Sequence, residues 1–215
     1  MSGLFNWGAK KAEVPASAPA SASLVVSADP PTASKVLRKF LTALAQQPSP
    51  VLVDLGPVVG TNISFFGERL ACKIHVVDLF AEVEKARRVQ AENMADLLLA
   101  RLVHGDESAD GILCWDLFDY LDKPTSQALA ARLATMLRKG GALYGFFANG
   151  AGELTTYSRF IVESDDGFRQ KAYPATPVKR NVLVNRDINR MFEGLVVAES
   201  VLLKSNTREA LFRKT

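Results

Sequence analysis

The sequence predicts an α/β domain in which helices cover both faces of a mainly parallel sheet. Continuous apolar runs, such as residues 51–55 and 110–115, are typical of strands that are buried on both faces. Stretches with apolar residues at helical spacing lie between these runs, and this alternation predicts right-handed crossovers between parallel strands. The last two apolar runs, on either side of Asn206, have no helix between them. We therefore expect them to form an antiparallel hairpin at one edge of the sheet.

The chain divides into an N-terminal extension, residues 1–31, and a domain, residues 32–215. Residues 12–31 are mostly Ala, Ser and Pro, a composition typical of a flexible linker. The head before this linker, residues 1–11, places three large apolar side chains ahead of two lysines. Such a head is either a frayed terminus or a segment that docks on a protein partner or a membrane surface.

The elements of the domain follow from apolar spacing and from the residues that end helices. Apolar side chains at helical spacing predict a first helix from about Thr32, which Pro48 and Pro50 end. The elements expected next are a strand at 51–55, a helix at 62–71, a strand at 73–79 and a helical stretch from about Glu82 to Leu102, broken at most once.

The second half of the domain continues this alternation and then becomes less regular. After the strand at 110–115, a helix from about Pro124 to Lys139 is ended by Gly140 and Gly141, and a buried strand follows at 142–148. The insertion of residues 151–180 contains two strand-like runs around an Asp-Asp-Gly sequence, which predicts a hairpin. A short helix after Asn185, its expected N-cap, precedes the terminal hairpin.

Candidate ligand-binding residues follow the predicted strands, because ligands of open α/β sheets bind beyond the carboxyl ends of the strands. These residues are Asp54, Gly56, Gly60 and Asn62 after the first strand, Asp78 after the second, and Trp115, Asp116 and Asp119 after the next clear strand. A glycine in the first turn permits close approach by a ligand, and Asp78 lies where an acid binds both hydroxyls of a ribose. Together they favour a nucleoside-containing ligand over a plain turn glycine and a solvated acid.

Four segments, VLVDLGPVVGTN, HVVDL, ADGILCWDLFDYL and MLRKGGALYGFF, resemble the class I S-adenosylmethionine-dependent methyltransferases. The resemblance covers about residues 32–215. It implies a Rossmann-like, seven-stranded, mainly parallel sheet, methyl transfer as the activity and S-adenosylmethionine as the cofactor. It also implies roles for single residues. Asp54, Gly56 and Gly60 would surround the methionine part of the cofactor, Asp78 would bind both ribose hydroxyls, and Leu79 would pack on the adenine.

The chain departs from that family's pattern in its first motif and in its third strand. Val58, beside Pro57, stands where the family usually has a further glycine, and its side chain is expected to crowd the cofactor. Asn62 is the candidate for a polar contact to the carboxylate end of the cofactor. Asp106 is the candidate for the acid near the adenine amino group, although helix-like residues run almost up to His104 and leave no clear third strand.

The methyl acceptor is expected beside Asp116 and Asp119, which are the best-placed carboxylates for a general base. Trp115, which we also count among the cofactor contacts, and Tyr120 are candidates to flank the acceptor. The alternatives are a helix cap for Asp116 and core packing for the two aromatic residues. The insertion of residues 151–180 is a candidate lid or partner surface, with a plain hairpin extension as the alternative.

Composition and the absence of known signatures limit the possible classes of methyl acceptor and the expected cellular compartment. The chain has 26 Lys and Arg against 23 Asp and Glu, and the formal charge of +3 disfavours a nucleic-acid acceptor and leaves a small molecule or a protein. No Asp/Asn-Pro-Pro-aromatic or Pro-Cys signature of DNA methylation occurs at the end of the strand at 110–115, which reads Cys114-Trp115-Asp116-Leu117. Two Cys and two His without zinc spacing predict neither a metal site nor a disulfide framework. No apolar run is long enough to cross a membrane, so we expect a cytoplasmic protein.

Two other functions stay open at this point. A methyltransferase-like module that has lost catalysis and serves in binding or assembly would account for Val58 and for the N-terminal head. A nicotinamide-dependent oxidoreductase would also use Asp78, but the turn from Gly56 to Thr61 lacks the G-x-G-x-x-G spacing of that class. The oxidoreductase is the least favoured of the three.

Overall fold

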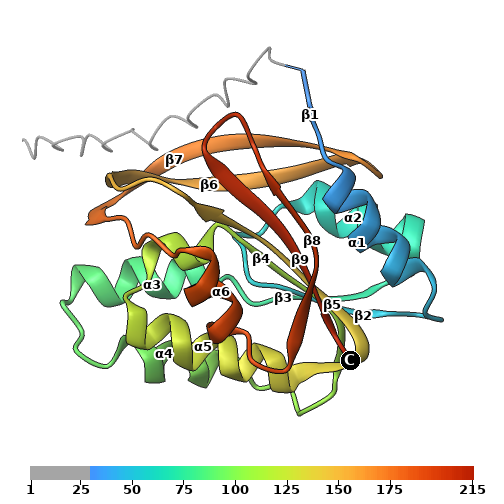
Figure 1. The fold of residues 1–215 in the computed structure, drawn as a ribbon, viewed down its shortest axis with the longest axis horizontal. Coiled ribbons are helices and arrows are strands. Elements are labelled where there is room, and N and C mark those ends of the chain that lie inside the picture. Colours follow the sequence, from blue (N-terminus) through green and yellow to red (C-terminus); the bar gives the residue numbers. More distant parts are fainter. Residues whose placement is uncertain (1–29) are drawn as a thin grey trace, which may run out of the picture.

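The computed structural model describes residues 30–215, and Figure 1 shows their arrangement. The main sheet contains β2 (Val51–Asp54), β3 (Lys73–Val76), β4 (Ala109–Trp115), β5 (Leu137–Ala148), β8 (Leu195–Leu202) and β9 (Thr207–Lys214). A second sheet contains β1 (Thr32–Ala33), β6 (Glu153–Ser164) and β7 (Gly167–Lys179). The helices are α1 (Lys35–Ala45), α2 (Gly60–Leu70), α3 (Leu79–Arg88), α4 (Met94–Arg101), α5 (Lys123–Met136) and α6 (Asn185–Met191), with a short 3₁₀ helix at Leu117–Tyr120.

The main sheet confirms the predicted fold class. Its strand order is β3-β2-β4-β5-β9-β8, with β2 parallel to β3 and β4, and β4 parallel to β5. β9 pairs antiparallel with both β5 and β8, as expected for a terminal hairpin at the edge. The described residues give this sheet six strands instead of the seven that the family resemblance implies. The segment of residues 102–108, where the third strand was sought, is mostly polar, contains Gly105 and joins α4 to β4 without pairing.

Alternate residues of the strands face two separate apolar layers, as expected for strands that are covered on both faces. Leu52 and Leu113 pack under α1 and α2, in a cluster that also contains Phe40. Val53 and Ile112 face the other side, where α3, α4, α5 and α6 cover the sheet. This two-sided burial explains why the sequence of these strands is continuously apolar.

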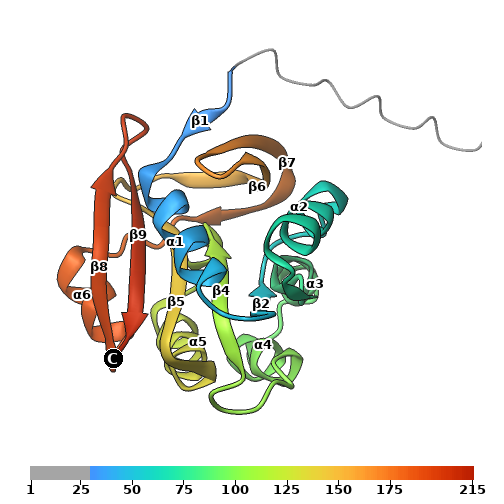
Figure 2. The ribbon, with the colours of Figure 1, turned by 90° about the vertical axis from the view of Figure 1, so that its right-hand side faces the viewer.

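The insertion forms the hairpin that the Asp-Asp-Gly sequence predicts, with β6 and β7 paired antiparallel from Glu153 to Lys179. The short strand β1 adds to β7 through Thr32 and Ala33. Figure 2 shows this second sheet lying across the carboxyl ends of the parallel strands, where ligands of such folds bind. The insertion is therefore part of the wall of the candidate site.

Several element boundaries differ from the sequence-based expectation. The long helical stretch has the one break that the sequence allowed, between α3 and α4, but it begins at Leu79. The helix before Gly140 ends at Met136, and Gly140 and Gly141 lie within β5 instead of ending that helix. The N-cap of α6 is Val184, because Asn185 is already its first helical residue. Within the described residues, no helix is long and apolar enough to span a membrane. The predicted head, residues 1–11, and most of the predicted linker lie outside the described residues.

Candidate functional site

Asp54, Gly56 and Trp115 meet where β2 and β4 end. Asp54 is buried, and its Oδ1 accepts hydrogen bonds from the Gly56 backbone N–H at 2.9 Å and from the Trp115 indole N–H at 2.7 Å. Burial raises the pKa of Asp54 to about 6, although both hydrogen bonds act in the opposite direction. A Cβ atom added to Gly56 would lie 2.5 Å from Cδ1 of Trp115. The close approach to this glycine is therefore made by an indole of the same chain.

The hairpin covers this indole and holds it in place. Phe160 of β6 stacks on Trp115 with ring centroids 4.9 Å apart and an interplanar angle of 5°, and Phe146 stacks on Phe160 in turn. Asn62 of α2 is buried, donates to the Phe160 carbonyl at 2.8 Å and accepts from the Val162 N–H at 2.9 Å. Both polar atoms of the Asn62 amide thus bind β6. This arrangement corrects the expectation that Asn62 faces the carboxylate end of a cofactor.

Asp78 opens onto a separate hollow of about 510 Å³ between α3 and the hairpin, called here the Asp78 hollow. Asp78 is half-buried and caps α3 by accepting from the Ala81 N–H at 3.0 Å. Tyr157 of β6 stacks on Phe80 at 4.6 Å and forms part of the wall. Leu79, predicted to pack on an adenine, is fully buried in the core beneath the hollow and does not line it.

Asp116 and Asp119 line a larger pocket of about 730 Å³, called here the Asp116 pocket. Asp116 follows β4 and does not cap the 3₁₀ helix after it with its side chain. Burial raises the pKa of each carboxyl to about 7. A hydrogen bond from Ser158 lowers the pKa of Asp116 by less than burial raises it, and the Ala148 N–H, 2.9 Å from Oδ1 of Asp119, acts in the same way. The structure thus brings the two predicted catalytic acids together.

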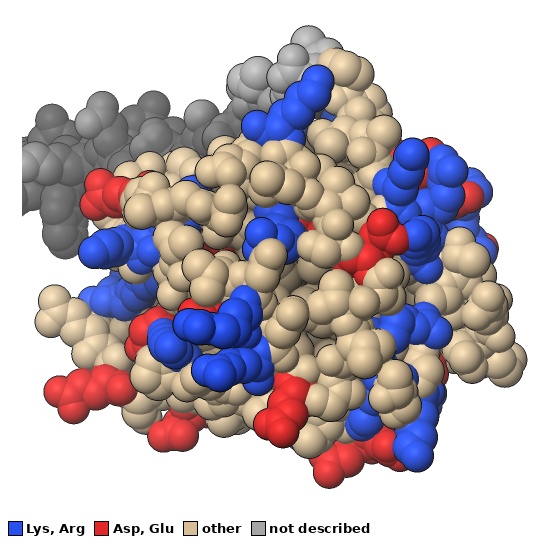
Figure 3. Space-filling model, in the orientation of Figure 1, with Lys and Arg blue, Asp and Glu red and all other residues tan. Residues whose placement is uncertain are grey.

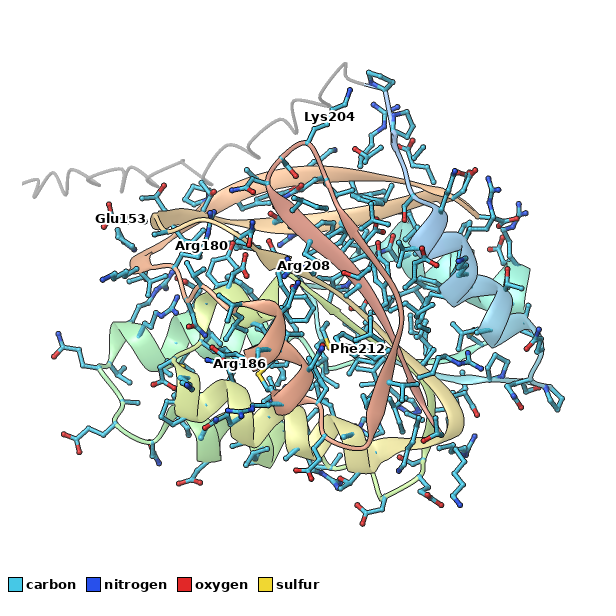
Figure 4. The ribbon with its side chains drawn as sticks, viewed as in Figure 1. Glu153, Arg180, Arg186, Lys204, Arg208 and Phe212 are labelled. Carbon is cyan, nitrogen blue, oxygen red and sulfur yellow. The ribbon has the colours of Figure 1, made fainter. Side chains whose placement is uncertain are left out.

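Basic side chains also reach this pocket. Arg180 follows β7 and Lys204 lies in the turn between β8 and β9, and both line the pocket (Figure 4). The positive charge of Arg180 lowers the pKa of Asp116 and of Asp119, against the effect of burial. The Arg180 Nε atom is buried and has no hydrogen-bond partner among the described residues. An unpaired buried donor beside two carboxyls is well suited to hold a polar ligand atom.

Strand β6 separates the two cavities. Its residues Thr156, Ser158 and Phe160 line the Asp116 pocket, whereas Tyr157 and Arg159 line the Asp78 hollow. This division follows from the alternation of side chains along a strand. The acid expected to bind a ribose and the acids expected to serve the acceptor are therefore on opposite sides of one strand.

Two residues of the predicted site, and Val58 of the first motif, lie elsewhere or have no special environment. Asp106 precedes β4 at the amino ends of the parallel strands, where it pairs with Arg132 of α5 at 2.5 Å, so the structure does not bring it to the site. A Cβ on Gly60, the first residue of α2, would meet no atom within 4 Å. Val58 is 54% exposed and lines neither cavity. The crowding expected from Val58 comes instead from Trp115.

Sequence reasoning missed the contributions of the insertion to the site. Arg180 is its last residue, and Ser158, Phe160 and Gln170 come from β6 and β7. Every second residue of β6 from Thr156 to Phe160 faces the Asp116 pocket, and this face combines polar and aromatic side chains. That pattern does not say which sheet end the hairpin covers, so the sequence alone could not place these residues at the site.

The charges around the site are mixed. On the face drawn in Figure 3, basic and acidic side chains alternate, with a small basic group over α6, from which Arg186 projects. No group of three or more His, Cys, Asp or Glu side chains among the described residues could hold a metal ion. The arrangement suits a small polar ligand better than an extended polyanion.

The S-adenosylmethionine expected from the resemblance fits this conformation at one end only. The nucleoside end has a half-buried acid, Asp78, beside an open hollow. The methionine end does not fit, because the Trp115 indole fills the approach to Gly56 and both polar atoms of Asn62 bind β6. The residues present therefore do not hold the whole cofactor in this conformation.

Comparisons with known proteins identify the family. The profile of the methyltransferase domain family matches residues 32–195. Two solved structures share the fold at low sequence identity. The PH0226 protein of Pyrococcus horikoshii is 11% identical, with a TM-score of 0.50 over 84% of this chain and 89% of that chain. A 1,6-didemethyltoxoflavin N1-methyltransferase of Burkholderia thailandensis is 15% identical, with a TM-score of 0.50 over 84% of this chain and 77% of that chain. No curated protein matches the sequence significantly. The chain belongs to the methyltransferase domain family, and its fold is that of these solved structures.

Proposed function

We propose that this methyltransferase acts on a small molecule that binds in the Asp116 pocket. The observation that carries the proposal is the pocket itself, about 730 Å³ at the carboxyl end of β4, with Asp116 and Asp119 in its wall. Its size suits a ligand of small-molecule dimensions. Phe146 and Phe168 supply apolar wall, and the acids and Arg180 supply polar contacts. The wall thus mixes polar and apolar side chains, which suits a polar small molecule.

Asp116 is the candidate general base for this reaction. Its pKa of about 7 lies close to a neutral operating pH, where a carboxylate is most effective in accepting a proton from an acceptor O–H or N–H. Asp119 is held by the Ala148 backbone and is better suited to orient the acceptor. A base is required only where the acceptor must lose a proton to become nucleophilic.

The basic residues indicate the acceptor's chemical class. Arg180 offers an unpaired, buried Nε–H and Lys204 stands at the rim, while burial keeps the two carboxyls partly protonated near pH 7. The pocket therefore favours an acceptor with an anionic group, such as a carboxylate or phosphate, for Arg180 to bind. A hydroxyl or amine on the same molecule would then face Asp116.

Methyl transfer from labelled S-adenosylmethionine to a panel of small acids, each paired with its neutral ester or amide, tests this function. We expect transfer to acids and loss of it in Asp116→Asn and Arg180→Met. Asp96→Asn, exposed on α4, is the matched control and should keep the activity. Transfer to proteins in a lysate, with none to small acids, would reassign the acceptor to a protein. Absence of cofactor binding at millimolar concentrations would remove the enzyme function.

A second candidate function is a binding or assembly module without catalysis. The indole of Trp115 over Gly56 is the observation that favours it, because this packing leaves no room for the methionine end of a cofactor. This candidate expects a stable partner recovered with the full chain and lost on deletion of residues 1–11. Robust methylation of any acceptor would remove it.

A further inference from the structure

We propose that the β6–β7 hairpin is an intramolecular gate that closes the cofactor site with the side chain of Phe160. In the closed state Phe160 presses the Trp115 indole onto Gly56, and S-adenosylmethionine and this ring stack compete for the same space. The proposal rests on the proposed function, because it assumes that the cofactor uses this site. It accounts for a methyltransferase chain in which the nucleoside end of the site is open and the methionine end is filled.

The ring stack is the part of the gate that fills space. Trp115 and Phe160 are 3% and 4% exposed, and their rings are nearly parallel. A Cβ on Gly56 would lie 2.5 and 2.8 Å from two atoms of the indole, so no ligand atom fits between the turn and the ring. A ligand can reach the Gly56 backbone only if the indole moves, and the indole can move outward only if Phe160 leaves its face.

The backbone of Trp115 adds a second reason to regard this packing as one of two states. Trp115 has φ of +50°, a left-handed conformation that a bulky side chain rarely adopts. Such a conformation persists only when the surrounding structure holds it. Here the surrounding structure includes the indole hydrogen bond to Asp54, the stack on Phe160 and an edge contact with Tyr144. Removal of the stack leaves the other two restraints.

Asn62 fastens the gate to the main domain. Its amide binds the backbone of β6 on both sides of Ile161, through the Phe160 carbonyl and the Val162 N–H. Because both contacts are to main-chain atoms, they fix the position of the strand and so the position of the Phe160 ring. Asn62 is 1% exposed, so its loss would leave two buried backbone groups without partners.

Two further contacts hold the hairpin over α3 and the 3₁₀ helix. Glu84 accepts from the Thr176 N–H at 3.0 Å and from its hydroxyl at 2.9 Å, and Tyr120 donates to the Thr156 carbonyl at 2.8 Å. The chain enters the hairpin through residues 149–152, where Gly152 has no atom within 4 Å of an added Cβ. The Gly152 carbonyl accepts from the Arg180 N–H at 2.8 Å, so the two ends of the hairpin are joined and would move as one unit.

Opening the gate would also join the two cavities. β6 stands between the Asp78 hollow and the Asp116 pocket, and methyl transfer requires the donor and the acceptor to be in contact. A shift of β6 away from Trp115 would remove the partition and clear the approach to Gly56. The same movement would therefore admit the cofactor and bring the acceptor side to it.

The gate makes the measured affinity for the cofactor depend on the fraction of open molecules. When the competent state is rare, the observed dissociation constant exceeds the intrinsic one by the inverse of that fraction. Weakening the closed state should therefore tighten binding, which is the opposite of the usual effect of a substitution at a binding site. Phe160→Ala removes the ring, and Phe160→Tyr keeps a ring that can stack on the indole.

Calorimetric titration with S-adenosylhomocysteine tests the gate on the full chain, with circular dichroism to verify folding of each variant. We expect Phe160→Ala to bind at least about tenfold more tightly than the unmodified chain, Phe160→Tyr to bind as the unmodified chain does, and Asn62→Ala to bind more tightly. Equal affinity of the unmodified chain and Phe160→Ala would overturn the gate and leave the proposed function intact. Tighter binding in Phe160→Ala without methyl transfer by any variant would support the gate and overturn the proposed function.

Fluorescence of Trp115 gives a second readout that a merely structural role of Phe160 would not produce. In a Trp7→Phe background Trp115 is the remaining tryptophan of the chain. Saturation of this chain with S-adenosylhomocysteine should increase quenching of Trp115 by acrylamide, because bound ligand keeps the ring away from Phe160. Binding with no change in quenching would overturn the gate, as would absence of binding in every variant.

Discussion

Asp54, Asp116 and Asp119 are carboxyl groups that folding removes from water, and burial raises the pKa of each. Hydrogen bonds from Gly56, Trp115 and the Ala148 backbone only partly offset this effect. The folded chain therefore holds protons on these groups that the unfolded chain would release. Ionising these buried carboxyl groups at the carboxyl ends of β2 and β4 is unfavourable. A ligand cation or hydrogen-bond donor bound there would stabilise the ionised form.

The buried acids make stability depend on pH. The carboxyl of Asp116 titrates near 3.8 in the unfolded chain and near 7 in the folded chain. The free energy of unfolding should therefore fall as the pH rises between these values, and this group should contribute no pH dependence outside them. We expect Asp116→Asn to raise the melting temperature at pH 8 relative to the unmodified chain, and to give a smaller difference at pH 4. An equal shift at both pH values, in thermal unfolding followed by circular dichroism, would contradict the raised pKa.

The two glycines of the first motif should respond differently to alanine. Gly56→Ala would place a Cβ against the Trp115 ring and should destabilise the fold by about 1–3 kcal/mol through overpacking. Gly60→Ala would meet no atom, so its effect should stay within about 0.5 kcal/mol. Urea unfolding of both variants provides the comparison, with Gly60→Ala as the matched control. Equal stability of the two variants would show that the indole does not pack on Gly56.

At the scale of elements, helix α1 depends on one buried polar cluster. Ser34 caps the helix by accepting from the Leu37 N–H at 2.8 Å. Its hydroxyl also donates to Glu209 of β9, which in turn accepts from Tyr144 of β5. Glu209 is 1% exposed, and burial raises the pKa of its carboxyl. The first turn of α1 is thereby joined to two strands of the main sheet.

Ser34→Ala should cost more than the loss of an ordinary cap. The cap contributes about 1 kcal/mol, and loss of a hydrogen bond to the buried Glu209 carboxyl adds about 1–3 kcal/mol. Thr42→Ala, on the exposed face of the same helix, removes a hydroxyl bonded only to the Arg38 carbonyl and should change stability little. Chemical unfolding of both variants distinguishes the two sites. A loss of 1 kcal/mol or less in Ser34→Ala would mean that the contact to Glu209 contributes nothing.

The elements themselves could be predicted from the sequence because local patterns determine them. Apolar spacing and the prolines at 48 and 50 predicted α1, and the Asp-Asp-Gly turn predicted the β6–β7 hairpin. The seventh strand that the family resemblance implies is the opposite case, because the described residues do not form it. Residues 102–108, where it would be expected, are mostly polar, include Gly105 and show no strand pattern.

At the scale of the whole molecule, the main sheet couples two apolar layers that share no side chains. The layer under α1 and α2 extends into the hairpin through Phe160, and the layer under α3 to α6 contains Phe212. The candidate site lies at the end of the sheet, where the hairpin covers both. The acids at strand ends could be predicted from topology, but Arg180 and Phe160 could not, because their place depends on where a long insertion folds back.

Because the two layers share one sheet, the described domain should unfold in a single transition. In a Trp7→Phe chain, fluorescence of Trp115 reports on the layer that contains the hairpin, and far-ultraviolet circular dichroism reports on all helices and strands. The two unfolding curves should coincide in urea. An earlier change in fluorescence would mean that the hairpin detaches before the sheet unfolds.

The contact between Gly56 and Trp115 also limits how this sequence can change. A larger residue at position 56 becomes tolerable only after a smaller one has appeared at position 115, so the two positions are free to vary only in that order. In close relatives of this chain that keep the tryptophan at 115, a glycine at 56 would not by itself indicate a ligand, because the indole alone requires it. A relative with a small residue at 115 would be the informative one, because there the glycine would have to be explained by something outside the chain.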